Sequence, residues 1–196
     1  TLADLQADPE NRWLTRFPKR RMEAEAIRDC LLQAGDRLDV GVKNSYLHVK
    51  NREFFFDHTS IDKTDYNHPC RSIYLPVVRN HLYDLFQLFD YSDAAVVLGH
   101  RDTTNVPTQA LCLMNSALAI DSSQGMAQRI LALDGTDAGR FALAVRIALQ
   151  REATAEETAM ACRMLEEASQ RGMDPLGAWS LLCQGLLASN EFLFLP

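Results

Sequence analysis

A helix-forming run occupies residues 107–133, which read PTQALCLMNSALAIDSSQGMAQRILAL. Proline suits the first position of a helix, where its missing N–H would have no intrahelical partner. Behind Pro107 the apolar side chains recur at three- and four-residue steps, which predicts an amphipathic helix; they are Ala110, Leu111, Leu113, Met114, Leu118 and Ile120. The pattern leaves open whether one helix continues to Leu133 or a second one restarts before it. Residues 134–137 (DGTD) end the run.

Further helices are expected on the C-terminal side of this run. One is marked by a stripe of Phe141, Val145, Ala148 and Leu149. Thr154 and Glu157 have the spacing of a capping box and start a helix that ends near Gly172. Asp174-Pro175 starts the last helix, whose apolar side carries Trp179, Leu182, Cys183, Leu186 and Leu187. The apolar tail 191–196 is expected to dock on the core.

On the N-terminal side, Asp8-Pro9 predicts a short helix that runs through Trp13 and ends before Pro18. A second helix is predicted from one apolar stripe of Met22, Ala26, Ile27, Cys30, Leu31 and Ala34, with Gly35 as its C-terminal cap. A further short helix is expected after residue 80, with Leu82, Leu85, Phe86 and Phe89 on one side.

The pattern changes between residues 36 and 78. Two aromatic and β-branched runs, 46–49 and 54–56, flank Lys50-Asn51-Arg52 and suggest a β-hairpin. Residues 57–71 are polar and predict a long loop. Residues 72–78 look extended, and Pro76 restricts them to an edge strand or an irregular segment.

These patterns together predict a mainly α protein: a helical bundle with a small β-hairpin or extended segment inserted between the early and later helices. We expect one domain over residues 1–196, with helices in 9–35, the hairpin and long loop in 36–79, and the helical bundle in 80–196. Because the sequence starts at Thr1 without a methionine, it is expected to be a fragment of a larger protein.

Composition excludes some partners. The formal net charge is −6, and nucleic-acid phosphates attract basic surfaces, so nucleic acid is not an expected partner. The basic run 19–21 is interpreted as a solvated face at a helix start beside Glu23 and Glu25, with an anion site as the alternative. No apolar run approaches the ~20 residues that span a bilayer, so no membrane insertion is expected.

The sequence carries no recognised catalytic or metal motif. The five cysteines form no CxxC pair. Four are interpreted as small buried hydrophobes, with a Cys162–Cys183 bridge left open, and Cys70 lies in the polar loop, where a reactive thiol is the alternative. The spacings of His58, His68, His81 and His100 match no ligand motif, so neither a metal nor any cofactor is predicted in this fragment. A carboxylate pair such as Asp57 with Asp65 offers the only hydrolase hypothesis, and catalysis by this fragment alone is not expected.

One polar set has two interpretations. It comprises Arg71, Arg79, Arg101, Thr103, Thr104, Gln109 and Asn115. Arginines beside the start of the Pro107 helix could hold a carboxylate, phosphate or sulfate, which makes these residues candidates for ligand binding. Alternatively, they pair with Asp65, Asp90 and Asp102 in a buried network that ties the extended segment to the bundle.

Several stretches also carry a family likeness. They are residues 20–29 (RRMEAEAIRD), 71–80 (RSIYLPVVRN) with 86–90 (FQLFD), 101–111 (RDTTNVPTQAL) with 115–116 (NS), and 187–192 (LASNEF). In combination they resemble the C-terminal planctomycete-specific domain of unknown function, found in large proteins that often carry planctomycete-type cytochrome c domains.

The resemblance implies context rather than chemistry. Such proteins are multidomain and look exported, which implies a periplasmic or cell-surface location and the upstream domains of the same polypeptide as partners. Three hypotheses follow. The chain is a structural or accessory module; it contributes an Arg/Thr/Asn-lined site, for a glycan or another anionic or polar ligand, that it shares with upstream domains; or it is a partner domain to a cytochrome c domain.

Overall fold

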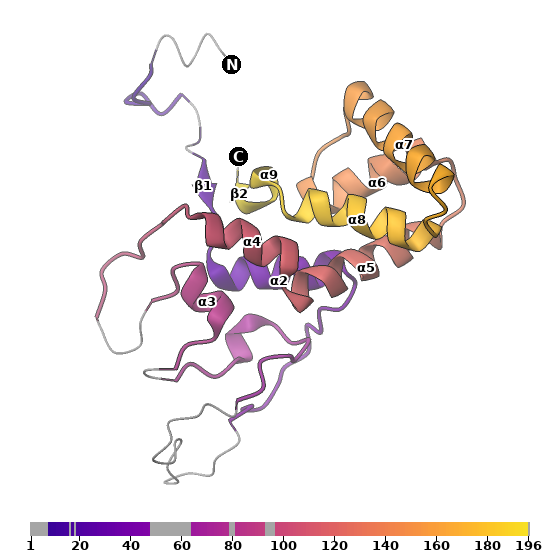
Figure 1. Ribbon diagram of the computed structural model, residues 1–196. Coiled ribbons are helices and arrows are strands. Elements are labelled where there is room, and N and C mark those ends of the chain that lie inside the picture. Colours follow the sequence, from indigo (N-terminus) through magenta and orange to yellow (C-terminus); the bar gives the residue numbers. More distant parts are fainter. Residues whose placement is uncertain are drawn as a thin grey trace.

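The computed structural model describes residues 8–15, 17, 19–47, 64–78, 81–92 and 97–195. Within them lie eight α-helices, one short 3-10 helix (η1, Ser72–Tyr74) and one antiparallel sheet of two strands, β1 (Arg20–Arg21) and β2 (Phe194–Leu195) (Figure 1). The α-helices are α2 (Ala24–Ala34), α3 (Asp84–Leu88), α4 (Pro107–Asn115), α5 (Ala117–Leu131), α6 (Asp137–Leu149), α7 (Ala155–Gln170), α8 (Pro175–Leu187) and α9 (Asn190–Leu193). The mainly α prediction is confirmed.

Helix α5 organises the bundle because it packs along α8 and also against α2 (Figure 1). It buries Met126 and Ile130, while α2 buries Ile27 and Leu31 in the same core. Helices α6 and α7 pack against each other and against α8. Removal of these apolar side chains from water, worth ~25 cal/mol per Å², is the main force that holds the helices together.

The end of α2 lies in very close contact with α5. A Cβ atom on Gly35 would lie 2.8 Å from the Cα of Ser122, and one on Gly125 would lie 2.4 Å from the carbonyl oxygen of Gly35. Only residues without a side chain permit this approach of two backbones. Gly35 also ends α2 as predicted, and its N–H donates to the carbonyl of Leu31 at 3.1 Å.

Side chains cap the first turns of the helices at the predicted starts. The hydroxyl of Thr154 accepts the N–H of Glu157 at 3.2 Å, and the Glu157 carboxylate accepts the N–H of Thr154 at 2.8 Å, so the predicted capping box is confirmed. The Asp174 carboxylate accepts the N–H of Gly177 at 2.8 Å in front of Pro175. The backbone is extended at Ser116, with ψ 143°, and this residue separates α4 from α5. The long run from Pro107 is therefore two helices.

The C-terminal tail pairs with the strand that precedes α2. Phe192 and Leu193 are buried in the core, as expected. Beyond them β2 pairs with β1, with Arg20 opposite Leu195 and Arg21 opposite Phe194. The N–H of Met22 also donates to the carbonyl of Leu193 at 2.8 Å. This sheet was not predicted, and the basic run 19–21 therefore enters a strand rather than a helix start.

The helix predicted from Asp8 to Trp13 is wrong. The Asp8 carboxylate does accept the N–H groups of Arg12 and Trp13, at 2.8 and 2.9 Å, as an N-cap would. However, Asn11 and Leu14 adopt left-handed backbone, with φ 53° and 54°, so residues 9–13 form turns only.

Two other expectations concern the irregular region. The segment 72–78 was expected to be extended, but it begins as the 3-10 helix η1, in which the N–H of Leu75 donates to the carbonyl of Ser72 at 3.0 Å. The hairpin predicted around residues 50–52 lies outside the described residues. In the part of the chain that the structure does describe, no helix combines the length and apolar character needed to cross a bilayer.

Candidate functional site

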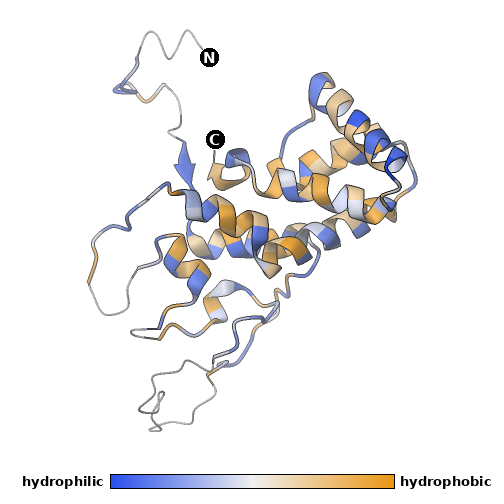
Figure 2. Ribbon diagram, in the orientation of Figure 1, coloured by the Kyte–Doolittle hydropathy of each residue, from blue (hydrophilic) through white to orange (hydrophobic). Residues whose placement is uncertain are grey.

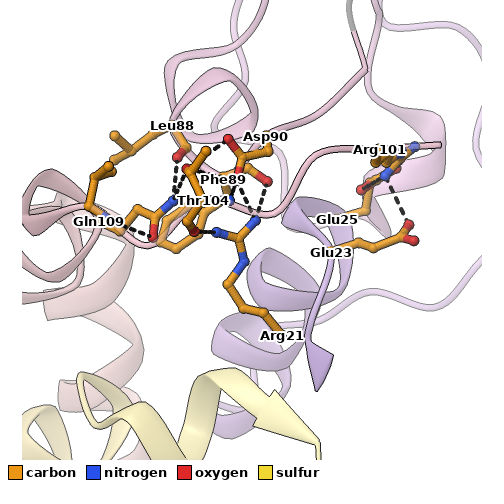
Figure 3. A network of polar contacts seen from close by, with 10 residues as sticks. Arg21, Glu23, Glu25, Leu88, Phe89, Asp90, Arg101, Thr104 and Gln109 are labelled. Carbon is orange, nitrogen blue, oxygen red and sulfur yellow. Dashed lines mark hydrogen bonds and ion pairs between the residues drawn. The ribbon is translucent and has the colours of Figure 1, made fainter. Parts of the chain in front are cut away.

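The polar groups gather where β1 and α2 meet the loop that follows α3 (Figure 3). Arg21 lies at the centre, although its neighbour Arg20 is exposed. Its Nη2 donates to the Asp90 carboxylate at 2.7 Å and to the Phe89 carbonyl at 3.1 Å, and its Nη1 donates to the Thr104 carbonyl. One guanidinium therefore holds two separate stretches of the loop region.

Asp90 is held as a carboxylate by its hydrogen bonds. Burial acts to raise its pKa, but donation from Thr104 and from Arg21 outweighs burial, and the pKa lies below its ordinary value. The N–H of Thr104 donates at 2.8 Å and its hydroxyl at 2.9 Å. Asp90 also adopts left-handed backbone, with φ 59°, which aspartate tolerates better than most residues.

Gln109 extends this network into the first turn of α4. Its side-chain amide donates to the Leu88 carbonyl at 3.0 Å and to the Thr104 hydroxyl at 3.3 Å (Figure 3). The residue is buried, so these bonds compensate for the loss of its hydration. Gln109 thereby fixes the start of α4 to the end of α3.

Arg101 makes a second ion-pair cluster with α2. Its Nη1 lies 2.9 Å from Glu23 and 2.8 Å from Glu25, and its Nη2 donates to Glu25 at 2.9 Å. The guanidinium also lies over the ring of Tyr91, 4.7 Å from the centroid. The hydrogen bond to Glu25 raises the pKa of Arg101 further above its ordinary value.

Arg28 anchors the irregular segment 66–72 to α2 from inside the core. Its Nη1 donates to the Cys70 carbonyl at 2.8 Å, and its Nη2 donates to the carbonyls of Tyr66 and His68. The adjacent Asp29 accepts the N–H and the hydroxyl of Ser72, at 2.8 and 2.6 Å. Arg28 is only 1% exposed, so its charge is compensated by these oxygen atoms rather than by water.

The residues predicted to bind a ligand are only partly brought together. Arg101 and Thr103 line a polar cleft of about 350 Å³ together with Arg20, Arg21, Glu23, His100 and Asp102, among others. Thr104 and Gln109 belong to the Arg21 network beside it. Asn115 lies at the other end of α4, where its amide donates to Leu111, and Arg71 is exposed at the start of η1. Arg79 lies outside the described residues.

Sequence reasoning missed the two central arginines, Arg21 and Arg28. For Arg28 a signal existed, because Ala24, Ile27 and Leu31 place it on the buried face of α2 at helical spacing. For Arg21 no local signal existed. Its burial depends on β2, which arrives from the other end of the chain.

The cysteines and the histidines carry no assembled site within the described residues. Cys70, expected in a polar loop, is completely buried, and all five cysteines are free, including Cys162 and Cys183. Burial raises the pKa of Cys183 to about 12. No group of three His, Cys, Asp or Glu side chains in the described ranges is placed to hold a metal ion. His58 and Asp57 lie outside those ranges.

The fold and the polar network define a mainly helical domain in which charged side chains hold irregular segments onto helices. A family model for PSD1, a protein of unknown function (DUF1553), matches residues 1–165. The chain therefore belongs to the PSD1 (DUF1553) family. No curated protein and no solved structure matches it. The stretches 20–29, 71–90 and 101–116, which carry the resemblance, fall inside the matched residues, and the stretch 187–192 falls outside them.

Proposed function

We propose that the chain is a structural accessory module of an exported multidomain protein and packs against other domains of the same polypeptide. The observation that supports this proposal is the hydrogen bonding of the arginines in the stretches that carry the family resemblance. Arg21, Arg28 and Arg101 all donate to carbonyls or carboxylates of the chain itself. Donors engaged inside the fold have little capacity left for a ligand. These residues are therefore assigned to holding loops in place.

A contact surface for such packing is offered by segments 36–47 and 71–78. The first segment is joined to the residues just before the second, because Asp39 forms a parallel bridge with Cys70 and donates its N–H to the Pro69 carbonyl at 2.7 Å. Val40, Val42 and Ile73 on these segments are 70%, 87% and 75% exposed. Surfaces that contact another domain are apolar and exposed in the isolated chain, and these three side chains are the proposed contacts.

Hydrogen exchange in the full-length polypeptide, compared with the isolated chain, tests this proposal. Amides of 36–47 and 71–78 are expected to exchange more slowly in the full-length protein. Helix α7 serves as the control, because it lies at the far end of the bundle (Figure 1) and its exchange should not change. Equal exchange of 36–47 and 71–78 in both proteins would contradict the proposed packing.

A second candidate is a ligand site shared with other domains, for a glycan or another polar or anionic ligand. The specific observation in its favour is that Arg101 and Thr103 line the same cleft with His100. Titration of the isotopically labelled full-length polypeptide with inorganic phosphate or oligosaccharides tests it, with the His100 ring signals as the probe. The Arg101→Gln variant should lose any response, whereas Arg71→Ala should keep it. No response in the wild type removes this candidate.

Export and a neighbouring cytochrome c domain are supported by the family resemblance alone, and we propose both on that ground. Fractionation of cells followed by detection of the full-length polypeptide tests export, because recovery only with cytosolic proteins would contradict it. The absorbance spectrum of the purified polypeptide tests the second proposal. Absence of a haem band would remove the partner role beside a cytochrome c domain.

A further inference from the structure

Two apolar surfaces of this chain have no covering element among the described residues. The first is the N-terminal arm, defined as residues 8–15 and 17. Trp13, Leu14 and Phe17 on this arm are 74%, 80% and 69% exposed. The second is the α5–α8 groove, whose exposed apolar residues include Ile120, Met173 and Leu181. We propose that the arm of one copy of the chain binds the α5–α8 groove of a second copy, and that the two copies exchange arms reciprocally.

The arm presents its apolar side chains on a defined turn. The Asp8 carboxylate accepts two backbone N–H groups, from Arg12 and Trp13, and the N–H of Leu14 donates to the Asn11 carbonyl at 3.2 Å. Because these bonds already order the backbone around Trp13, binding loses less conformational entropy than it would from an unstructured segment. Large aromatic side chains are also the usual anchors of protein interfaces.

The α5–α8 groove suits such an anchor. It has a volume of about 480 Å³ between α5 and α8, and it is lined by apolar residues such as Leu176 and by polar residues such as Gln124 and Gln184. Hydrophobic residues dominate α8 and the adjacent α4 (Figure 2), and Leu111 and Met114 of α4 are exposed. The amide of Gln184 donates to the Met114 carbonyl at 2.7 Å and keeps α4 and α8 together. The groove therefore offers a preformed apolar surface with a polar rim.

The geometry of the arm favours a second copy over the chain's own groove. The arm leaves the bundle at β1, beside α9, and extends away from α5 and α8 (Figure 1). Its root is fixed, because Arg20 and Arg21 pair with β2 and Met22 donates to Leu193.

The area to be covered favours a reciprocal exchange over a one-way contact. The three arm side chains expose on the order of 400 Å² of apolar surface, since one aromatic side chain buries about 150–250 Å². One arm on one groove would then bury about 800 Å² in total, whereas stable interfaces bury about 1,200–2,000 Å². Two arms and two grooves reach about 1,600 Å², and the twofold arrangement closes without leaving a free arm or groove.

Sedimentation velocity over micromolar concentrations of the chain tests the inference. The wild type is expected to dimerise. An arm variant, Trp13→Ser with Phe17→Ser, and a groove variant, Leu181→Lys, should each weaken dimerisation by at least about thirtyfold, the loss typical of a central interface residue. All three positions are exposed, so the bundle should keep its melting temperature. Met160→Lys, at an exposed position of α7 outside the groove, is the matched control and should leave the dimer intact.

Mixing the arm variant with the groove variant tests whether the arm of one copy binds the groove of the other. Each mixed pair retains one intact arm and one intact groove that match, so a weak heterodimer should form although neither variant associates alone. A wild type that stays monomeric at every concentration overturns the inference, as does a dimer that survives both variants. A monomer in which Trp13 is shielded from acrylamide quenching would place the arm in its own groove and also overturn it. The proposed packing through 36–47 and 71–78 uses other residues and would be unaffected.

Discussion

Arg21 and Asp90 lie 69 positions apart in the chain, and their side chains form an ion pair with 2.7 Å between Nη2 and Oδ2. The Arg21 side chain is 4% exposed and that of Asp90 is 16% exposed. This pair joins β1, which is itself fixed by the C-terminal β2, to the end of α3. The strand pair β1–β2 is thereby connected to the loop that leads into α4.

Replacement of Arg21 by alanine should lower the free energy of unfolding by about 3 kcal/mol, because it removes the ion pair from Asp90 and leaves the Phe89 and Thr104 carbonyls without their donor. Urea denaturation measures this loss. Arg20→Ala is the matched control, since Arg20 lies on the same strand with an exposed side chain, and its effect should stay within about 0.5 kcal/mol. Equal stability of the two variants would show that the Arg21–Asp90 pair contributes nothing.

Replacement of Arg28 by lysine should release segment 66–72 from α2. Lysine keeps the charge but lacks the planar fork that reaches Tyr66, His68 and Cys70 together, so we expect a loss of at least about 2 kcal/mol. Faster labelling of Cys70 by a thiol reagent, located by mass spectrometry, would report the opening. Arg37→Lys, in an exposed pair with Asp121, is the control and should leave Cys70 unreactive. Unchanged labelling in Arg28→Lys would contradict the anchoring role.

Stability should fall in acid partly through the Arg151 cluster. The Arg151 guanidinium donates to Glu157 at 2.6 Å and to Glu191 at 2.5 Å. The hydrogen bond from Arg151 is the largest cause, and the one from the Thr154 N–H is the second, of a pKa of Glu157 that is lowered from 4.5 to about 2. A lowered pKa in the folded state stabilises the fold above about pH 4.5, and this contribution is lost as the pH falls towards 2.

Comparison of unfolding free energies at several pH values between 5 and 2 tests this cluster, because Arg151→Ala should flatten the pH dependence in that range. Arg146→Ala is the control. Its partner Glu152 is 75% exposed and contributes little. If Arg151→Ala keeps the full wild-type dependence, the acid sensitivity arises elsewhere.

Alanine at Gly125 should destabilise the α2–α5 contact by about 1–3 kcal/mol, because the added Cβ must push the Gly35 carbonyl away. Gly185→Ala is the matched control in α8. Nothing lies within 4 Å of its added Cβ, so removal of the glycine should instead stabilise the helix by about 0.5–1 kcal/mol. Thermal unfolding of both variants gives the comparison. A stable Gly125→Ala protein would mean that the two backbones can separate at little cost.

Local sequence patterns determined the helical part of this protein. Apolar side chains at helical spacing predicted α2, α3, α4, α6 and α8 and left open whether α5 starts anew, and the Thr154–Glu157 box and Asp174-Pro175 marked the starts of α7 and α8. These signals act between residues a few positions apart, so they can be recognised without the tertiary structure. The same locality explains an error. Asp8-Pro9 starts a turn as a cap would, but left-handed backbone at Asn11 and Leu14 prevents a helix, and leucine rarely adopts that conformation.

Only the tertiary structure decided which polar residues act together. One interpretation of the sequence paired Arg71, Arg79 and Arg101 with Asp65, Asp90 and Asp102. In the folded chain Asp90 pairs with Arg21, and Arg101 pairs with Glu23 and Glu25. Those pairings depend on contacts between segments 69 and 76–78 positions apart, which depend on how whole helices pack. Composition and spacing can list the charges of this chain. The partner of each charge is set by the burial that long-range packing creates.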